Sequence, residues 1–441
     1  MANVAGFSHL PVAVAGRARA GVAAACTKPA IRVTTVHMDI AFTPDEERFR
    51  AEARAWLAEH APKLEPPEHD LAARRAFDLS WQRTLFDAGY AGISWPKEYG
   101  GRGASLMEQL IWYEEFARSG AHDPSTLFVG LNHGGPTLIA CGSEEQKAFH
   151  LPKILRGEVI WCQGFSEPGA GSDLAGLSTR AVIDGDDLVV TGQKIWTSFA
   201  QIAEYQELLV RTDPDAPKHK GITWVICPMG LPGMEIREIK TMAGGSDFCE
   251  VFYDEVRIPR ANIVGKLNDG WNVAMSTLSF ERGTAFLSEQ VRLTRLVDQL
   301  IDVARHAPAG DAASVPANAL GDDEIARRLA LLRAEVEALR SMTYRSVSRT
   351  ARTGVPSAEA SLIRLFFSEL QQRVFALAME VLGPEILAWD AEGSPARVTA
   401  RHAGAPSWVS HWLMAFSSTI AAGSKDIQRN IIGDRILGLP R

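Results

Sequence analysis

The chain has 441 residues, a formal net charge of −7 and a hydrophobic content of 46%. This length allows two or three domains with a large core, and the acidic balance without a long Lys/Arg block argues against nucleic-acid binding. The hydrophobic runs are too short or too charged to span a bilayer, and the five cysteines show neither a CxxC pair nor metal-ligand spacing. We therefore expect a soluble globular protein of a reducing compartment, without a metal site.

Residues 1–37 differ in composition from the rest of the chain. They contain no acidic residue and are rich in Ala and Val, with basic residues at Arg17, Arg19, Lys28 and Arg32. An Arg-rich, acid-poor stretch is typical of an organellar transit peptide, which would place the protein in the mitochondrial matrix. The alternative is a start codon upstream of the true one at Met38, and the few serines favour it. We expect a disordered extension without chemistry and, under the second interpretation, a cytoplasmic protein.

Residues 38–160 carry the apolar spacing of amphipathic helices and are predicted to form an all-helical N-terminal domain. Thr43 precedes three acidic residues and is predicted to cap the first helix. Further helices are expected at about 76–88 and 104–118, from His133, and from a cap at Ser143.

The pair Glu114–Glu115 within the third of these helices raises the question of acid–base catalysis. Adjacent residues face different directions on a helix, so two neighbouring carboxylates do not converge on one substrate. We therefore expect these two residues to lie on a solvated face.

Between residues 161 and 270 the apolar residues come in short β-branched runs separated by turn residues. This pattern predicts antiparallel strands of a small barrel or sandwich, the middle domain of the chain. The runs cover residues 188–190, 208–210, 222–226, 234–236 and 251–253.

Two segments of this middle domain have the composition of a binding site. SEPGAGSD (residues 166–173) favours a loop with outward backbone N–H groups, suited to phosphate or to the polar edge of a cofactor. In GQKIWTS (residues 192–198), the Trp196 indole can lie flat on an aromatic cofactor and the Ser198 hydroxyl can bond a ring nitrogen. The loop alone equally fits an ordinary polar turn, and the pair is more specific.

Residues 271–441 return to helical spacing. Apolar residues recur at three- and four-residue intervals through about 293–301, 325–339 and 363–381. Three long amphipathic helices and a shorter C-terminal pair predict a four-helix-type bundle with an extension, interrupted by a surface loop at 307–321. The predicted fold class is therefore α+β, mainly α: a helical domain, an antiparallel β-barrel domain and a helical bundle.

The two motifs together resemble the flavin-binding signature of the acyl-CoA dehydrogenase family, which reads TEPxAGSD and then GxKxWITN. The resemblance extends from Met38 to Arg441. It implies an FAD-dependent oxidoreductase of fatty-acid β-oxidation and lipid metabolism, which introduces an α,β double bond into an acyl-CoA thioester. It also implies a dimer or tetramer, of like or unlike chains, that passes electrons to an electron-transferring flavoprotein.

The same resemblance implies which residues contact FAD. Ser166 would lie near the ring edge, and Ser172 near the pyrophosphate or the substrate; Trp196 and Ser198 would cover the ring and meet its N5 atom. The implied cofactor-binding residues are Gln163, Gly164, Phe165, Ser166, Gly171, Ser172, Trp196, Thr197, Ser198, Gly423, Ser424 and Asp426.

The catalytic base departs from the commonest family pattern. That pattern has a Glu before Gly-Thr-x-x-Ile-Gln, but AGSKDIQR (residues 422–429) has Ala422 there, which by itself would suggest an inactive chain. Isovaleryl- and long-chain-type members have Glu-Arg on the first bundle helix, as in LSFERG (residues 278–283). We predict Glu281 as the base rather than a surface residue paired with an Arg. Phe280 and Arg282 would adjoin the substrate, and the backbone N–H of Ala422 would polarise the thioester carbonyl.

The residues expected at the adenosine end of the cofactor site also depart from the family pattern. The family's Arg-x-x-Phe-Gly element is missing, and the Gln of its Gln-x-x-Gly-Gly element is Glu380. This pattern is similar to that of actinobacterial dehydrogenases that pair two unlike subunits and act on steroid side chains. Two alternatives stay open: a non-catalytic partner subunit of a hetero-oligomer, and a flavin monooxygenase or acyl-CoA oxidase on the same fold.

Overall fold

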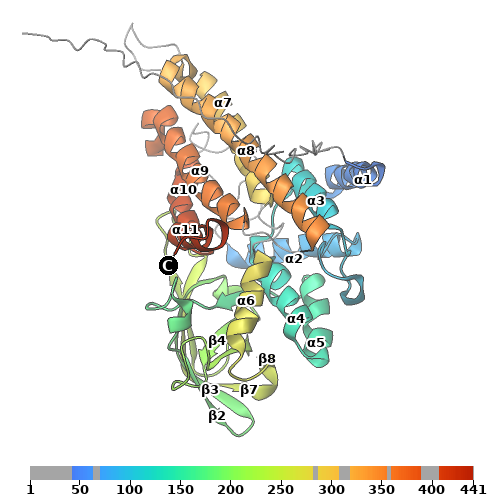
Figure 1. Ribbon diagram of the computed structural model, residues 1–441, viewed down its shortest axis with the longest axis vertical. Helices are drawn as coiled ribbons and strands as arrows, with labels where there is room; N and C mark the ends of the chain where they lie inside the picture. The colour runs from blue at the N-terminus through green and yellow to red at the C-terminus, as the bar shows by residue number, and fades with distance from the viewer. Residues whose placement is uncertain are drawn as a thin grey trace, which may run out of the picture. The chain divides into compact units, whose positions relative to one another are not determined.

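The computed structural model describes residues 42–62, 70–281, 287–306, 318–354, 359–388 and 407–440, without the side chains of residues 280, 281 and 388. Thr43–Arg441 forms one compact unit, whose described helices and strands are coloured in Figure 1, and everything below concerns this unit. The predicted extension over residues 1–37 lies outside the described residues. None of the described helices combines the length and apolar character that crossing a membrane requires.

The first part of this unit is helical, as predicted. Thr43 caps the first helix in a capping box, in which its hydroxyl accepts from the Glu46 N–H at 3.3 Å and its own N–H donates to the Glu46 carboxylate at 2.7 Å. Ser143 caps a later helix in the same way. The α-helices are α1 (Pro44–His60), α2 (Leu71–Asp87), α3 (Leu106–Ser119), α4 (Gly135–Cys141) and α5 (Glu144–Leu155), with short turns η1 (Lys97–Tyr99) and η2 (Ser125–Leu127) and a π-helical turn η3 (Gly130–Gly134).

The prediction of a solvated face for Glu114 and Glu115 is wrong. Both carboxylates are buried, with 0% and 2% of their surface exposed. Arg50 of α1 donates to both, at 3.1 and 3.0 Å, and Arg340 donates to Glu114 at 3.0 Å. The sequence argument treated α3 as a single helix, whereas α3 contacts α1 on one side and the later helices α7 and α8 on another. Glu114 and Glu115 face different sides of α3, and both sides are covered by other helices.

The middle part is a sheet of eight strands in the order β6-β7-β3-β2-β4-β5-β8, with β1 paired to β4. All five predicted apolar runs fall on strands. Most ladders are antiparallel, as expected, but β1–β4 and β2–β4 are parallel. Parallel neighbours need a crossover connection, which short-range turn signals do not indicate. The strands are β1 (Trp161–Gly164), β2 (Arg180–Asp184), β3 (Asp187–Ser198), β4 (Tyr205–Arg211), β5 (Ile222–Pro228), β6 (Met234–Ile239), β7 (Phe248–Pro259) and β8 (Ile263–Val264).

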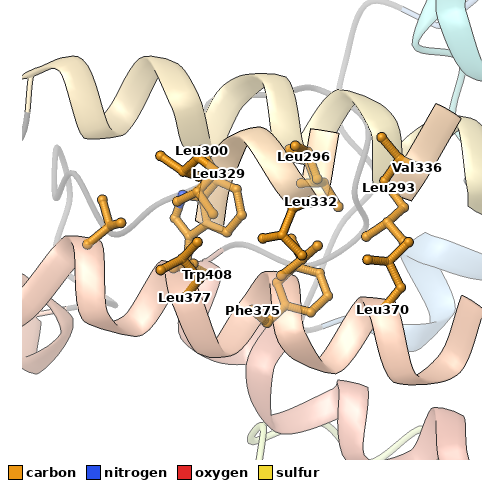
Figure 2. Packing of buried hydrophobic residues seen from close by; sticks show 14 of the residues in the cluster. Leu293, Leu296, Leu300, Leu329, Leu332, Val336, Leu370, Phe375, Leu377 and Trp408 are labelled. Atoms are coloured by element: carbon orange, nitrogen blue, oxygen red, sulfur yellow. The ribbon is translucent and has the colours of Figure 1, made fainter. Parts of the chain in front are cut away.

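The last part is helical again. Its long helices pack side by side and enclose a hydrophobic core built from the predicted apolar stripes (Figure 2). Trp408 of the short helix α10 closes this core and is 1% exposed. The helices are α6 (Gly270–Glu281), α7 (Leu287–His306), α8 (Asp323–Thr353), α9 (Glu359–Leu382), α10 (Trp408–Ala415) and α11 (Lys425–Ile431), with turns η8 (Ala319–Gly321), η9 (Gly383–Ala388), η10 (Phe416–Thr419) and η11 (Ile432–Ile436).

Helix α6 joins the three parts of the unit. It contacts β5 of the sheet and also α4 and η3 of the N-terminal helices (Figure 1). The buried hydroxyls of Thr277 on α6 and Thr137 on α4 lie 2.8 Å apart and share a hydrogen bond. This polar contact inside an apolar interface fixes the rotation of α6, whose last residue is the predicted base.

Candidate functional site

The structure brings the two predicted binding motifs together. The loop at 166–173 lies between β1 and the turn η4 (Leu174–Gly176), and the second motif forms the end of β3. The Ile195 N–H donates to the Ser166 carbonyl at 3.0 Å, and Glu167 and Ala170 exchange two backbone hydrogen bonds that close the loop. The loop is therefore held as a tight turn against the strand that carries Trp196.

A buried ion pair ties the same two motifs. Lys194 of β3 is 0% exposed, and its ammonium donates to the Glu167 carboxylate at 2.8 Å and to the Phe165 carbonyl at 3.1 Å. Glu167 also accepts from the backbone N–H groups of Ser178 and Thr179, at 2.7 and 2.9 Å. These charge-assisted hydrogen bonds hold the loop between β1 and β2 against β3.

The pKa values of this pair show what burial does to each partner. Burial opposes ionisation of Glu167, but the charge of Lys194 and the donated hydrogen bonds outweigh it and lower the pKa of Glu167 to about 2. Burial lowers the pKa of Lys194 to about 8, although Glu167 counteracts it. The carboxylate is thus strongly stabilised in its charged form, while the lysine is charged only because of its partner.

Trp196 lies at a β-bulge. The pairing of β3 with β7 shifts register between Lys194 and Thr197, and Trp196 has φ 61°. A left-handed conformation is rare for a bulky residue and is retained mainly where function or surrounding structure demands it. The bulge turns the indole outward, where it is 57% exposed and contacts the Phe248 ring only by an edge, with centroids 6.1 Å apart. A large aromatic face is therefore presented to a ligand.

The residues after Trp196 present hydroxyl groups. The Thr197 side chain is buried, and its hydroxyl has no hydrogen-bond partner among the described residues. Ser198 is half-buried and pairs with Phe248 of β7. The Phe199 N–H donates to the Asp247 carbonyl at 2.7 Å, and burial raises the pKa of the Asp247 carboxyl. A buried hydroxyl without a partner is costly unless a bound group satisfies it.

Gln163 of β1 faces a different polar cluster. Its amide donates to the Glu207 carboxylate of β4 at 2.7 Å and lies 3.1 Å from His133 Nδ1 of η3, which is itself 3.2 Å from Glu207. Gly164 is followed by the buried Phe165. Because η3 contacts α6, this cluster links the strand that begins the binding loop to the helix that ends at Glu281.

The glycines of the loop leave space outside it. A Cβ atom built at Gly169 or Gly171 meets nothing within 4 Å, and Ser172 is exposed. Packing within the chain therefore does not require glycine at these positions. Behind the loop, Arg211 donates to the Ala175 carbonyl at 2.7 Å and braces the following turn. The outward side is free for a ligand that approaches the backbone closely.

The C-terminal part of the predicted site is a strained turn before α11. Ala422 and Gly423 both have positive φ, 54° and 82°. Gln428 is 2% exposed, and its amide donates to both carbonyls, at 3.3 and 3.1 Å. The Ser424 hydroxyl caps α11 by accepting from the Ile427 N–H, and Asp426 forms an exposed ion pair with Arg429. Among the described residues, no hydrogen bond or ion pair joins this turn to the motifs at 163–198.

The predicted catalytic group lies at the limit of the described chain. Glu281 is the last residue of α6, and its side chain and that of Phe280 are not described; Arg282 lies outside the described residues. The contacts of α6 with η3 and β5 bring the helix itself next to the Gln163 cluster and the sheet. The role of Glu281 stays a prediction.

Sequence reasoning missed the structural role of Glu167 and Lys194. Both residues were part of the two motifs, but only the fold shows that they pair. The sequence did contain an indication of this pair: each motif has a charged residue among apolar or turn-forming neighbours, and a buried Glu or Lys is rarely found without a partner of opposite charge. It also missed His133 and Glu207, whose pairing depends on contacts between helix and sheet.

Models of the three domains of one family match the chain: the N-terminal domain of acyl-CoA dehydrogenase at residues 43–158, its middle domain at 162–256 and its C-terminal domain at 268–437. The chain belongs to the acyl-CoA dehydrogenase family. The predicted family and fold class are confirmed, and the chain is an oxidoreductase of this family.

Several acyl-CoA dehydrogenases are similar over almost the whole chain. Acyl-CoA dehydrogenase IpdE1 of Mycobacterium tuberculosis is 37% identical, over 90% of this chain and 98% of its own. The solved ChsE4-ChsE5 complex of the same organism is 35% identical over 92% of this chain and 100% of that one, with a TM-score of 0.75. The Tcur3481-Tcur3483 steroid ACAD (acyl-CoA dehydrogenase) is 31% identical over 92% of this chain and 100% of that one, with a TM-score of 0.76. The bacterial origin of the first two gives no support to the mitochondrial alternative.

The residues present fit the flavin that this family implies. The exposed indole of Trp196, the unpartnered buried hydroxyl of Thr197 and the open side of Gly169 and Gly171 lie along one loop and one strand end. Glu380, where the acyl-CoA dehydrogenase pattern has Gln, is instead engaged by Arg328 of α8, at 2.5 and 2.9 Å.

Proposed function

We propose that this chain is an FAD-dependent acyl-CoA dehydrogenase that removes the α-proton of an acyl-CoA thioester with Glu281 and forms the α,β double bond. The flavin, when bound, accepts the β-hydrogen as hydride. The observation that carries the proposal is the bulge at Trp196, because it exposes a strained aromatic side chain beside the ion-paired loop at 166–173.

The proposed roles of the other residues follow their positions. Gly164 to Ser166, Gly171 and Ser172 offer backbone and hydroxyl groups at the loop, with Ser172 also toward the substrate; Trp196 covers the ring. Thr197 and Ser198 offer hydroxyls on β3, and Gln163 orients the base of the loop. Gly423, Ser424 and Asp426 would contact the cofactor from α11, and the N–H of Ala422 would donate to the thioester oxygen, where negative charge develops.

Glu281 is proposed because the position usually occupied by the base is Ala422. Support comes from α6, which is held against η3 and β5 and fixed in rotation by the Thr277–Thr137 hydrogen bond. A residue at the end of such a helix can be positioned within the small tolerance that proton abstraction requires. Phe280 and Arg282 would flank it, one as an apolar wall and the other as a neighbouring charge.

The test is the reductive half-reaction of a Glu281→Gln variant. We expect this variant to retain flavin but to lose several orders of magnitude in the rate of flavin reduction when it is mixed anaerobically with acyl-CoA thioesters. A straight, a branched and a steroid-derived thioester should be compared, since the acyl group is not fixed by the motifs. Normal bleaching of the flavin by the variant would place the base elsewhere, with Asp247 the next carboxyl to replace.

The two alternatives make different predictions for the purified chain. A non-catalytic partner would be colourless alone and yellow only with a companion chain. An oxidase or monooxygenase would release hydrogen peroxide or a hydroxylated product under air, whereas a dehydrogenase would pass its electrons to an electron-transferring flavoprotein.

We also propose a dimer or tetramer of like or unlike chains acting in lipid or steroid breakdown. One similar solved structure is named as the ChsE4-ChsE5 complex, and another is named with two chains, as the Tcur3481-Tcur3483 steroid ACAD. The segments just after η10 and η11 carry large exposed apolar side chains, including Ile420, Leu437 and Leu439, at 70%, 62% and 56% exposure. Such side chains are expected at an interface, and light scattering of the chain alone tests it.

A further inference from the structure

The turn before α11 is anchored to the long helix α9. Arg364 of α9 donates through one guanidinium nitrogen to two backbone carbonyls, that of Ser418 in η10 at 2.9 Å and that of Ala421 at 3.2 Å. Gln372 of the same helix donates to the Thr419 hydroxyl at 3.0 Å. Helix α9 also packs against α10, η10 and α11 (Figure 1). The residues that lead into Ala422 are therefore held by a helix rather than left as a free loop.

The contact from Arg364 fixes the direction of one backbone N–H group. A trans peptide unit is planar, and its carbonyl and N–H point in opposite directions. The Ala421 carbonyl and the Ala422 N–H belong to the same unit, so a guanidinium bonded to the carbonyl aims the N–H away from itself. The N–H groups of Ile420 and Ala421 both donate to the Ser417 carbonyl, at 2.9 and 2.8 Å. No group of the described chain, by contrast, accepts a hydrogen bond from the Ala422 N–H.

The peptide unit that follows Ala422 is held as well. The buried amide of Gln428 donates to the carbonyls of Ala422 and Gly423, at 3.3 and 3.1 Å. Both peptide units that flank the Ala422 Cα atom are thus fixed by a side chain. Ala422 itself has φ 54°, a left-handed conformation that a residue with a Cβ atom retains only where the surrounding structure imposes it.

The charge of Arg364 also strengthens the donor that it aims. A cation at a carbonyl oxygen draws electron density through the amide and makes the N–H at the other end a better donor. Arg429 of α11 is engaged elsewhere, because it pairs with Glu369 at 2.6 Å and with Asp426 at 3.3 Å. Arg364 is therefore the guanidinium that acts on the Ala421–Ala422 peptide unit.

We propose that Arg364 is a positioning residue for thioester activation. It holds the Ala421 carbonyl so that the Ala422 N–H meets the thioester oxygen where negative charge develops. A donor that is oriented in advance stabilises this charge most in the transition state, and loss of one such donor costs ~10²–10³ in rate. Arg364 acts through the backbone and does not contact the substrate. This inference rests on the proposed function, in which the Ala422 N–H donates to the thioester, and it adds the group that aims this N–H.

The first test measures flavin reduction by the holoenzyme under anaerobic conditions, with the straight, branched and steroid-derived acyl-CoA thioesters at increasing concentrations. Arg364→Met keeps an apolar stem and removes the donors and the charge. We expect its limiting rate to fall roughly tenfold to a hundredfold and the half-saturating thioester concentration to change less than about threefold, because the charge develops only in the transition state. Arg364→Lys restores a charged donor and should recover most of the rate. Arg373→Met is the matched control on the same helix, where Arg373 pairs with Glu335 of α8, and it should keep the wild-type rate.

The second test observes the thioester carbonyl without catalysis. In 4-(dimethylamino)cinnamoyl-CoA an electron-donating group is conjugated to the carbonyl, so a hydrogen bond to the carbonyl oxygen moves the absorption to longer wavelength. Difference spectra at saturation should show this red shift with the wild-type holoenzyme and with Arg373→Met, and a clearly smaller one with Arg364→Met. Loss of packing alone would lower the free energy of unfolding or the flavin content and would leave the absorption of the bound thioester unchanged.

A limiting rate of Arg364→Met within about twofold of the wild type, or an unchanged red shift in this variant, would overturn the proposal. So would a bound cinnamoyl thioester without a red shift in the wild type, and this measurement does not depend on how the variant folds. If Arg364→Met does not fold, Arg364→Lys should show an intermediate red shift, and a shift equal to that of the wild type would count against the proposal. A red shift that depends on Arg364, without flavin reduction by any thioester, would contradict the proposed activity alone.

Discussion

Replacement of Lys194 by Met tests the idea that a buried ion pair shapes the cofactor loop. Met has nearly the length of the lysine stem and fills its apolar surroundings, but it removes the charge that faces Glu167. In the folded protein the pKa of Glu167 falls from 4.5 to about 2, and one pH unit corresponds to about 1.4 kcal/mol. The ionised carboxylate is therefore favoured by about 3 kcal/mol, within the range of the ~3–5 kcal/mol lost when one member of a buried pair is removed.

We expect Lys194→Met to lower the free energy of unfolding by about 3 kcal/mol at neutral pH and to reduce flavin content. The pH dependence follows from the sign of the shift: the stabilisation from Glu167 is complete above pH 4.5 and is lost as the pH falls toward 2. The double variant Glu167→Gln/Lys194→Met should recover most of the stability, because burial also lowers the pKa of Lys194 to about 8 and disfavours its charge. Gln keeps an acceptor for one of the two N–H groups, since Ser178 and Thr179 donate to different oxygens of Glu167.

The assay is urea unfolding followed by tryptophan fluorescence, together with visible flavin absorbance of the purified protein. Lys218→Met is the matched control, because Lys218 pairs with Asp173 of the same loop while both side chains are half or more exposed. Such a pair contributes about 1 kcal/mol or less. A loss from Lys194→Met no larger than the loss in the control, or a double variant no more stable than the single one, would refute the reasoning.

Three further predictions concern single positions. Trp196→Gly should relieve the strain of the left-handed backbone and leave the apoprotein as stable as the wild type or about 1 kcal/mol more stable. Flavin titration of this variant should show binding at least tenfold weaker. An unchanged flavin affinity would contradict a role for the indole. Burial lowers the pKa of His411 to about 4, so on acidification the unfolded chain binds a proton before the folded protein does. The free energy of unfolding should therefore fall by up to about 3 kcal/mol between pH 6.5 and 4. In unfolding at several pH values, His411→Gln should show a smaller fall than the wild type, whereas His306→Gln, a change at an exposed residue, should show the same fall as the wild type. Gly135→Ala should lower the thermal unfolding midpoint through a loss of about 3 kcal/mol, since its Cβ would meet Trp95, whereas Gly169→Ala, which meets nothing, should leave it within error.

Elements that depend on neighbouring residues could be predicted from the sequence. The capping boxes at Thr43 and Ser143 are formed within four residues, so the helix starts follow directly from the residue types. The apolar stripes of the bundle reappear as its core because helical periodicity fixes which residues share a face (Figure 2). The five β-branched runs form strands because side chains alternate between the two faces of a strand, so a local pattern again fixes which residues share a face.

Contacts between distant segments could not be predicted in this way. Glu114 and Glu115 are buried because α1 from the N-terminal part and α7 and α8 from the C-terminal bundle pack against α3, and the parallel ladders of β4 depend on crossovers. The left-handed backbone of Trp196 follows from a register shift between β3 and β7. Because β7 begins some fifty residues later in the chain, no local pattern in the sequence encodes this shift.

The sequence by itself determined the order of helices and strands, the resemblance to acyl-CoA dehydrogenases and the two segments that form the candidate site, because residue spacing and backbone preference act over short distances. Only the tertiary structure decided that Glu167 pairs with Lys194, that the Trp196 indole faces outward and that Arg364 holds the carbonyl before Ala422. Each of these depends on which surfaces meet when the chain packs, and burial then sets the charge and the hydrogen bonding of the groups that are enclosed.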